Sequence, residues 1–289
     1  MIDGIRLEDG EYGRRAVATS AWSEEITNYL LNNGIVELEL NYAKGWRRND
    51  LLFLARLPLL QSFTIVDWNI SSVDPIHFLR ELRALKVATY CDTEIRFSAF
   101  PRLEQCVLEW RRKATSLFDC ITLKKLFVNG YKGKDVIPFA KLVNLESLAI
   151  LNAPIANLRG LGSLKKLRSL RIAGLRRLTS LAGIEELVNP EELYINTCRA
   201  IGSIEEVGLL SRLRTLDLNN GGNIKSLKPL DKLEGLQSMG FYASTNILDG
   251  DLWPLLRQKN LNLSRVSFQN RRHYSHRREE IWSWLDKVN

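Results

Sequence analysis

The stretch from residue 145 to residue 164 reads LESLAILNAPIANLRGLGSL, and its opening pattern L-x-x-L-x-L returns along most of the chain. The pattern starts at Ile35, Leu60, Leu82, Leu103, Leu123, Leu145, Leu167, Pro190, Leu213, Leu236 and Leu263. Of the 33 anchor positions in these eleven repeats, 32 are aliphatic, aromatic, Met or Cys, and Pro190 is the exception. A chain that is 45% hydrophobic would place only about 15 such residues there by chance. A period of 20 to 27 residues therefore predicts a solenoid of stacked repeats.

Each L-x-L segment is expected to form a short strand whose side chains alternate between the core and the outside. In the ninth repeat, Leu216 and Leu218 would point inward. Asp217 and Asn219 would then point outward. Stacked strands of this kind form one parallel sheet, with the return arcs on its other face. We expect one structural domain whose solenoid, eleven repeats long, covers residues 35–270.

Both ends of the repeat array carry helix signals. Ser23 precedes two glutamates, which is typical of a helix start. At the other end Ser275 can start a helix, whose apolar residues at helical spacing are Ile281, Trp282, Leu285 and Val288. We predict an N-terminal cap over residues 1–34, whose first twenty residues give weak signals and are expected to be cap or loop, and a C-terminal helical cap over residues 271–289.

Composition points to a cytoplasmic protein. The N-terminus has no basic segment followed by an apolar run, so we expect no secretory signal, and no stretch of about 18 apolar residues predicts a membrane span. The four cysteines form no C-x-x-C pair. This spacing argues against a zinc or redox motif and fits buried, reduced thiols.

The repeat over residues 145–164 resembles the short repeats of leucine-rich-repeat proteins, in particular the internalin-like and phosphatase-regulatory types. The matching apolar positions are Leu145, Leu148, Ile150, Ile155, Leu158, Leu161 and Leu164. Repeats seven to ten are slightly longer, and residues 193–201 resemble the cysteine-type repeats of other branches, with Cys198 at the cysteine position. The resemblance implies an α/β repeat solenoid, a leucine-rich-repeat horseshoe with a concave parallel sheet of about eleven strands and helical caps at both ends.

The chain departs from that family at the ninth repeat position, where the resemblance implies an asparagine whose amide binds the turning backbone. From the second repeat onward this position holds Trp68, Tyr90, Arg111, Tyr131, Ala153, Leu175, Cys198, Gly221, Ser244 and Arg271. The resemblance therefore does not fix the curvature or the loop shape. We expect Trp68, Tyr90 and Tyr131 to pack over the sheet edge in place of the missing amides.

Charges on the outward strand positions nearly balance. The acids are Glu37, Glu39, Glu109, Glu192 and Asp217, and the bases are Lys86, Lys125, Arg171 and Arg265. The net charge of +8 must then lie mainly on the arcs and ends, in pairs such as Arg176-Arg177. A phosphate-binding face would need these bases gathered along one groove, so we expect them to be solvated surface.

Aromatic and polar side chains on the outward face are the candidate protein-binding residues, because Tyr, Trp and Arg most often anchor protein interfaces. We expect the in-strand Phe127, Tyr194 and Tyr242 to be exposed and available for binding. The full predicted partner-binding set is Glu39, Lys86, Glu109, Trp110, Phe127, Arg171, Tyr194, Asn196, Asp217, Asn219 and Tyr242.

The segment from Arg271 to Arg278 has the sequence RRHYSHRR, which allows one structural and two functional interpretations. We expect a cap in which arginine side chains bind backbone carbonyls. An anion or acidic-protein contact is one alternative. A metal pair at His273 and His276 is the other, but no third ligand accompanies it. The third histidine, His77, is expected to be structural, because it falls in an arc.

Enzyme motifs are absent: the sequence contains no H-E-x-x-H, no G-x-S-x-G and no phosphate-binding loop. Three histidines and no paired-carboxylate signature leave little for acid–base chemistry. We therefore expect a non-catalytic scaffold that binds a protein partner and needs no cofactor or metal. Small molecules, membranes and nucleic acids are not the expected partners. Two alternatives are a bacterial regulator or immunity protein that neutralises a toxin or effector, and a basic nucleic-acid-binding solenoid.

Overall fold

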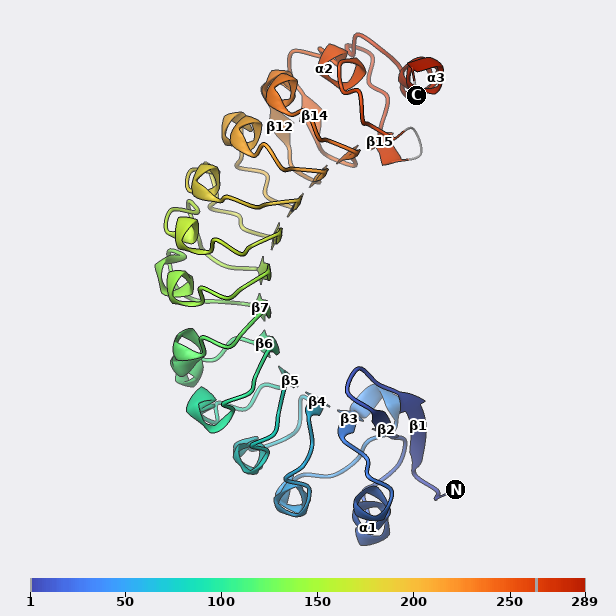
Figure 1. Ribbon diagram of the computed structural model, residues 1–289, viewed down its shortest axis with the longest axis vertical. Coiled ribbons are helices and arrows are strands. Elements are labelled where there is room, and N and C mark those ends of the chain that lie inside the picture. The colour runs from blue at the N-terminus through green and yellow to red at the C-terminus, as the bar shows by residue number, and fades with distance from the viewer. Residues whose placement is uncertain (1, 263–264, 289) are drawn as a thin grey trace. The chain divides into compact units, whose positions relative to one another are not determined.

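The chain is built from short strands that alternate with arcs, and most arcs contain a 3-10 helix (Figure 1). A computed structural model describes residues 2–262 and 265–288. It divides into two compact units, Met1–Val128 and Asn129–Asn289.

The first unit begins with two strands and a helix and continues with five repeats. Its strands are β1 (Ile5–Asp9), β2 (Arg14–Ala18), β3 (Glu37–Asn41), β4 (Ser62–Val66), β5 (Ala84–Ala88), β6 (Gln105–Glu109) and β7 (Lys125–Asn129), the last ending at the unit boundary. Its helices are α1 (Glu24–Asn32), η1 (Tyr42–Lys44), η2 (Leu52–Arg56), η3 (Asp74–Phe78), η4 (Phe97–Ala99) and η5 (Arg112–Asp119). The strands follow one another in sequence order through the sheet. Strand β1 is antiparallel to β2, and β2 to β6 run parallel.

The second unit contains the remaining repeats and the C-terminal cap. Its main strands are β8 (Ser147–Leu151), β9 (Ser169–Ala173), β10 (Glu192–Asn196), β11 (Thr215–Asn219), β13 (Ser238–Phe241) and β15 (Val266–Phe268), paired in that order. Two short strands in the arcs, β12 (Asn223–Ile224) and β14 (Asn246–Ile247), form a separate parallel pair. The helices are η6 (Ile137–Lys141), η7 (Leu161–Ser163), η8 (Ile184–Glu186), η9 (Glu205–Leu209), η10 (Lys228–Lys232), α2 (Trp253–Leu256) and α3 (Arg278–Val288).

The predicted repeat strands all form, as β3 to β11, β13 and β15. In the second unit Leu148, Leu170, Leu193 and Leu216 pair side by side, and each is at most 1% exposed. Every predicted anchor among the described residues is buried, while Leu263 lies outside them. Since burying one leucine stabilises a fold by about 1.5–3 kcal/mol, the aligned anchors provide most of the stability of each unit.

The N-terminal segment, expected to be cap or loop, contains a β-hairpin over residues 5–18 that forms the end of the sheet. Its signal is weak: β2 buries only Ala16, Val17 and Ala18, and β1 is mostly polar. Strand β2 pairs in parallel with β3 and so adds the hairpin to the edge of the repeat sheet.

The same hairpin corrects the prediction for Glu37, which is fully buried instead of facing solvent. Its carboxylate accepts hydrogen bonds from the backbone amide of Tyr12 and from the guanidinium of Arg15, the latter at 2.9 Å. Tyr12 reaches further along the unit, where Gln105 donates to its hydroxyl at 3.0 Å and the guanidinium of Arg83 lies 4.5 Å from its ring centre. The hairpin therefore covers part of the outward face of the first unit.

Both helical caps form, but only the first begins as predicted. Ser23 caps α1 by accepting a hydrogen bond from the amide of Ile26 at 3.3 Å. At the C-terminus, Ser275 does not start α3, which begins at Arg278. Its hydroxyl instead accepts from the amide of Leu252 in the arc before α2. Ile281 and Leu285 are buried as predicted, and the side chain of Val288 lies outside the described residues.

The backbone leaves the strands through a left-handed residue at the eighth repeat position. In the second unit these residues are Gly130, Asn152, Gly174, Thr197, Asn220 and Ala243, with φ between 51° and 73°. This conformation turns their amides toward the next repeat, as from Asn152 to the carbonyl of Ala173 at 2.8 Å and from Thr197 to that of Asn219 at 3.0 Å. A ladder of backbone amides thus links the turns that lack the expected asparagines.

Candidate protein-binding face

The outward side chains of β9, β10 and β11 form a continuous row in the second unit. Strand register places Tyr194 between Arg171 and Asp217. The guanidinium carbon of Arg171 lies 4.7 Å from the centre of the Tyr194 ring, which is a cation–π contact. The sequence predicted these three residues as binding residues, and the fold makes them neighbours. Tyr194, which we expected to be exposed, is half-buried.

Asp217 is the most unusual member of this row. Its Oδ1 atom is enclosed and has no hydrogen-bond partner. Burial raises the pKa of the Asp217 carboxyl above its usual range, and the charge of Arg171 opposes that shift. On the other side of Asp217 the register places Gly240, which has no side chain to contribute. Asp217 is therefore a half-buried carboxylate with one enclosed, unpaired oxygen on the outward side of the sheet.

Two asparagines and a tyrosine line the ends of the same strands. Asn196 is exposed, and its side-chain oxygen accepts a hydrogen bond from the hydroxyl of Thr197 at 2.8 Å. Asn219 has a structural task, because its side-chain oxygen accepts from the amide of Tyr242 at 2.9 Å. Tyr242 is 47% exposed, as predicted. These residues extend the polar and aromatic surface beside Tyr194.

The predicted binding residues of the first unit lie on separate strands. Glu39 on β3 forms an ion pair with Lys44 at 2.7 Å, and Lys86 on β5 is exposed. Glu109 ends β6, and Trp110 after it is half-buried with its ring 5.7 Å from that of Phe118. Phe127 on β7 is half-buried rather than exposed. The row formed by Arg171, Tyr194 and Asp217 has no counterpart among them.

The aromatic residues of the ninth position behave in two ways. Tyr131 is buried against Phe139, with ring centres 5.1 Å apart, as the packing prediction requires. The prediction is wrong for Tyr90, which is 79% exposed. The Tyr90 ring contacts the ring of the half-buried Trp68, with ring centres 4.5 Å apart and the planes tilted by 31°, and it faces solvent on its other side.

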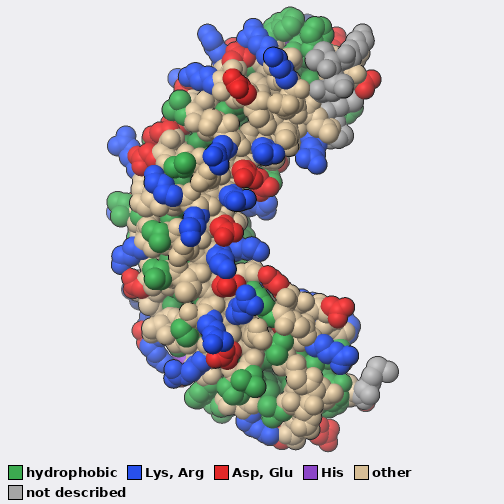
Figure 2. All heavy atoms as spheres, viewed as in Figure 1, with side chains coloured by type: hydrophobic (Ala, Val, Ile, Leu, Met, Phe, Trp, Pro, Cys, Tyr) green, Lys and Arg blue, Asp and Glu red, His purple; other side chains and the backbone are tan. Residues whose placement is uncertain are grey.

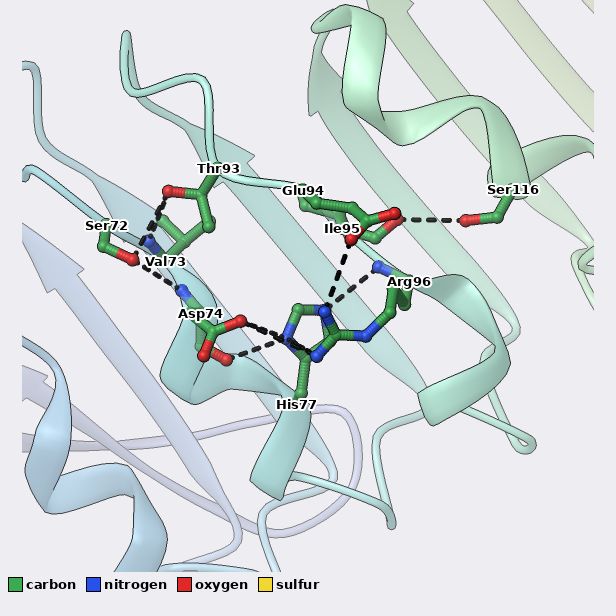
Figure 3. A network of polar contacts seen from close by, with 9 residues as sticks. All are labelled: Ser72, Val73, Asp74, His77, Thr93, Glu94, Ile95, Arg96 and Ser116. Carbon is green, nitrogen blue, oxygen red and sulfur yellow. Dashed lines mark hydrogen bonds and ion pairs between the residues drawn. The ribbon is translucent and has the colours of Figure 1, made fainter.

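His77 lies in an arc, where it joins two neighbouring turns (Figure 3). Its Nδ1 lies 2.8 Å from the backbone carbonyl of Asp74, and its Nε2 accepts a hydrogen bond from the amide of Arg96 at 3.0 Å. This geometry requires the neutral ring with its proton on Nδ1. Burial lowers the pKa of His77, Arg96 lowers it further, and Asp74 acts in the opposite direction.

The C-terminal basic segment is built into the cap. Arg271 donates hydrogen bonds through Nη2 to the backbone carbonyls of Ala243 and Thr245, both at 3.1 Å. This contact confirms the prediction that an arginine of this segment binds backbone carbonyls in the cap. His273 lies 2.9 Å from the carbonyl of Ile247, and His276 stacks edge-on against Trp253. Across the described residues no group of three potential metal ligands occurs.

The four cysteines, all described, carry free thiols. Burial raises the pKa of the Cys106, Cys120 and Cys198 thiols. Burial would also raise the pKa of Cys91, but hydrogen bonds with Thr89, with Thr93 and with Arg111 outweigh it and hold that pKa below its usual range.

Basic and acidic side chains are interspersed on the face of the molecule that Figure 2 presents. Several pairs form ion pairs between neighbouring repeats, such as Arg83 with Glu104 at 3.0 Å and Arg257 with Asp231 at 2.8 Å. No helix within the described ranges combines the length and apolarity needed to span a bilayer.

A parallel stack of turns, each anchored by the L-x-x-L-x-L residues, is the leucine-rich-repeat fold. Solved structures with this fold are similar to the chain. An internalin, InlF, of Listeria monocytogenes is 22% identical with a TM-score of 0.62, over 95% of this chain and 85% of that one. A leucine-rich-repeat protein of Leptospira interrogans is 20% identical with a TM-score of 0.64, over 92% and 73% of the two chains.

The functional domain of InlJ from Listeria monocytogenes, which includes a cysteine ladder, is 19% identical with a TM-score of 0.54. That match covers 82% of this chain and 55% of that one. In this sequence a single cysteine, Cys198, occupies the ninth repeat position. No protein-family model matches the sequence, and neither does any curated protein.

Proposed function

We propose that this protein is a non-catalytic scaffold that binds a protein partner on the outward face of β9, β10, β11 and β13. The row of Arg171, Tyr194 and Asp217 carries the proposal, because it joins a cation, an aromatic ring and a half-buried carboxylate on neighbouring strands of one sheet. Interface anchors are typically aromatic and arginine side chains held by a preorganised surface. Tyr242 enlarges this surface at the strand ends.

The contacts of His77 support a structural rather than a catalytic role for this histidine. A general base must reach a substrate proton through a free ring nitrogen. In His77 both ring nitrogens already face backbone groups, the carbonyl of Asp74 and the amide of Arg96. Its arc therefore joins neighbouring turns and presents no base.

The experiment compares two matched triple variants in a capture assay. The first replaces Tyr194, Asp217 and Tyr242 by alanine. The control replaces Tyr42, Tyr90 and Asp92, which are also two tyrosines and one aspartate with exposed side chains, in the first unit. Wild-type protein captures its partner from native extract, mass spectrometry identifies it, and titration measures the affinity of each variant.

We expect the first variant to lose partner affinity by about 30-fold or more, since even one interface anchor contributes ~2 kcal/mol. The control variant should bind as the wild type does. Circular dichroism melting confirms that both remain folded. Unchanged affinity in the first variant would show that the partner binds elsewhere.

We also propose that the protein resides in the cytoplasm, where thiols stay reduced. The free state of Cys91, Cys106, Cys120 and Cys198 supports this location. Immunoblotting of cytosolic, membrane and secreted fractions from native cells tests it, and recovery in the secreted fraction would contradict it.

A further inference from the structure

We propose that a groove beside the amino-terminal ends of β10, β11 and β13 binds an acidic segment of the partner protein through Arg212 and Arg214. This inference rests on the proposed function, because it names the chemistry that the partner presents at the border of its binding face. The charge pattern along that edge of the sheet is the observation that motivates it.

Side chains of alternating charge stand at the second position of consecutive repeats, directly before each strand. In the second unit this charge column consists of Glu146, Arg168, Glu191 and Arg214, and it ends at the uncharged Gln237. The amide of Arg214 donates to the carbonyl of Glu191 at 2.8 Å, and the amide of Gln237 donates to the carbonyl of Arg214 at the same distance. Residues of the column are therefore neighbours from one repeat to the next.

The same column in the first unit shows how such charges compensate one another. There the carboxylate of Glu104 forms ion pairs with Arg83 in the preceding repeat and with Lys124 in the following one, each at 3.0 Å. Both bases are thus neutralised by an acid of an adjacent repeat.

Arg214 lacks this compensation in the second unit. Its acidic neighbour Glu191 forms an ion pair with Arg168 at 3.8 Å, and its other neighbour is Gln237. Arg214 is exposed, and its guanidinium forms neither an ion pair nor a hydrogen bond with any described residue. The acid that the alternation would place in the following repeat is therefore missing.

A groove of about 450 Å³ lies at this break in the column. Arg212 and Arg214 both line it, on either side of the buried Leu213. Arg212 is exposed as well, and its guanidinium has no ion pair in the part of the chain that the structure describes. In the next repeat Gly235 stands at the position of Arg212, and a Cβ atom built onto it would have no contact nearer than 3.7 Å. The glycine thus leaves room for a side chain from outside.

The charge of the groove favours a carboxylate ligand. Arg212 and Arg214 bring two positive charges, against the single acid Glu191 among the residues that line the groove. Guanidinium groups bind carboxylates through charge-assisted and often bidentate hydrogen bonds. The hydroxyl of Ser211 and the amide of Gln237 line the same groove and can donate as well. An aspartate or glutamate of the partner would therefore supply the missing acid.

A nucleic acid fits this edge less well than an acidic protein segment. Its regularly spaced phosphates require bases gathered along one groove. In the charge column Glu146 and Glu191 alternate with Arg168 and Arg214, so acids interrupt the bases. The inferred ligand is therefore a protein segment with neighbouring acidic side chains.

The test titrates isotope-labelled protein at low salt with acetylated and amidated pentapeptides of sequence GEEEG, GQQQG and GKKKG, and follows amide and arginine side-chain resonances by NMR. The acidic peptide should shift the resonances of Arg212, Arg214 and Gln237 in a saturable way, and added salt should weaken its binding. The neutral and basic peptides should shift none of them. A thymidine oligonucleotide that binds this groove more tightly than the acidic peptide would overturn the assignment to a protein segment.

Charge-matched variants assign the effect to the groove. Arg212→Gln and Arg214→Gln should each weaken binding of the acidic peptide by about 5-fold, the loss expected for one ion pair at a surface. Arg176→Gln removes the same charge from an exposed arginine of the second unit that does not line the groove, and it should leave binding unchanged.

A further variant places the missing acid in the chain itself. Gln237→Glu should pair with Arg214, weaken binding of the acidic peptide by about 5-fold and leave the melting temperature at the wild-type value or above. Gln269→Glu makes the same charge change at an exposed glutamine after β15 and should leave peptide binding unchanged. The pair of variants thus separates an occupied groove from a change in net charge.

The proposal is overturned if the acidic peptide leaves the resonances of Arg212 and Arg214 unmoved, or if Gln237→Glu binds it as tightly as the wild type. The double variant of Arg212→Gln and Arg214→Gln should also lose affinity for the natural partner, and undiminished capture would likewise overturn the proposal.

Failure of the proposed function has a different signature. In that case the triple variant of Tyr194, Asp217 and Tyr242 captures the natural partner with undiminished affinity, whatever the peptides do.

Discussion

The guanidinium of Arg111 donates a 2.8 Å hydrogen bond from Nη2 to the hydroxyl of Thr89, in the preceding turn of the solenoid. Its Nη1 donates to the carbonyl of Cys91 at 2.9 Å, and the side chain is buried. Arg111 stands at the ninth repeat position. An arginine therefore holds the turning backbone of the neighbouring repeat where the leucine-rich-repeat pattern has an amide.

Replacing Arg111 by alanine should lower the free energy of unfolding by about 3 kcal/mol, because the hydroxyl of Thr89 and the carbonyl of Cys91 lose buried donors. Urea denaturation measures the change. Arg112→Ala, at the exposed neighbouring position, should change the stability by no more than ~0.5 kcal/mol. Equal losses in the two variants would show that the Arg111 contacts contribute nothing beyond a surface charge.

Thr197 occupies the left-handed backbone region with φ of 54°, which disfavours a β-branched residue. Thr197→Gly should raise the free energy of unfolding by about 1 kcal/mol, since glycine adopts this conformation without a Cβ clash. Thermal melting measures the gain, and an unchanged or lower melting temperature would contradict it.

Gly174 occupies the same eighth position in the preceding repeat, where the reverse kind of substitution, glycine to a residue with a Cβ atom, can be made. Its φ is 66°, and an added Cβ would lie 2.3 Å from the side-chain oxygen of Asn152. Gly174→Ala should therefore destabilise the protein by at least ~1 kcal/mol. The two substitutions together test whether the eighth position governs the turn, because they must move the melting temperature in opposite directions.

His77 should make stability fall on acidification. The folded protein lowers the pKa of His77 below its usual 6.5, so the unfolded chain binds the proton first. The stability from the neutral ring is complete above pH 6.5 and is lost as the pH falls toward the lowered folded pKa. Protonation of Nε2 would also remove the acceptor of the Arg96 amide.

The control for this titration is His77→Gln, which keeps an acceptor near the Arg96 amide and does not titrate. Denaturation curves give the free energies of unfolding of the two proteins between pH 7.5 and pH 5. The lower limit is about 1.5 units below the usual pKa of histidine. The wild type should lose stability relative to the variant as pH falls. If the free energies of unfolding of the two proteins fall in parallel, His77 is not the source of the pH dependence.

Cys91 should react with iodoacetamide before the other three cysteines. Its thiol is partly accessible, and its hydrogen bonds with Thr89 and Arg111 favour the thiolate, which is the nucleophile. Cys106, Cys120 and Cys198 are buried. Peptide mass spectrometry after timed labelling at pH 8 measures the order. Faster labelling of any buried cysteine would contradict it.

The sequence predicts the repeat strands well because one physical signal, burial of an aliphatic side chain every other residue, recurs in all of them. Leu193 and Leu216 could be aligned from spacing alone, and the structure pairs them. The hairpin could not be predicted in this way. Its inward residues Ala16 and Ala18 are too small to stand out, and in β1 only two residues, Ile5 and Leu7, follow the apolar alternation.

The candidate site was only partly predictable for a related reason. Alternation within a strand places Asp217 outward, but it does not reveal that Gly240 on one adjoining strand leaves that side of the carboxylate without a neighbouring side chain. Likewise, the alternation of side chains in β3 correctly places Glu37 on the outward face. Its burial depends on Tyr12 and Arg15 from a segment whose strands carry almost no periodic signal.

The hairpin also determines how the sheet of the first unit ends. Without it, β3 would leave a row of unpaired backbone amides and carbonyls, and open edges of this kind recruit further strands. With it, the outermost strand is β1, only five residues long and bearing Arg6, Glu8 and Asp9. Charged, short edges resist such pairing, so the N-terminal strands discourage chain-to-chain polymerisation at that edge of the first unit.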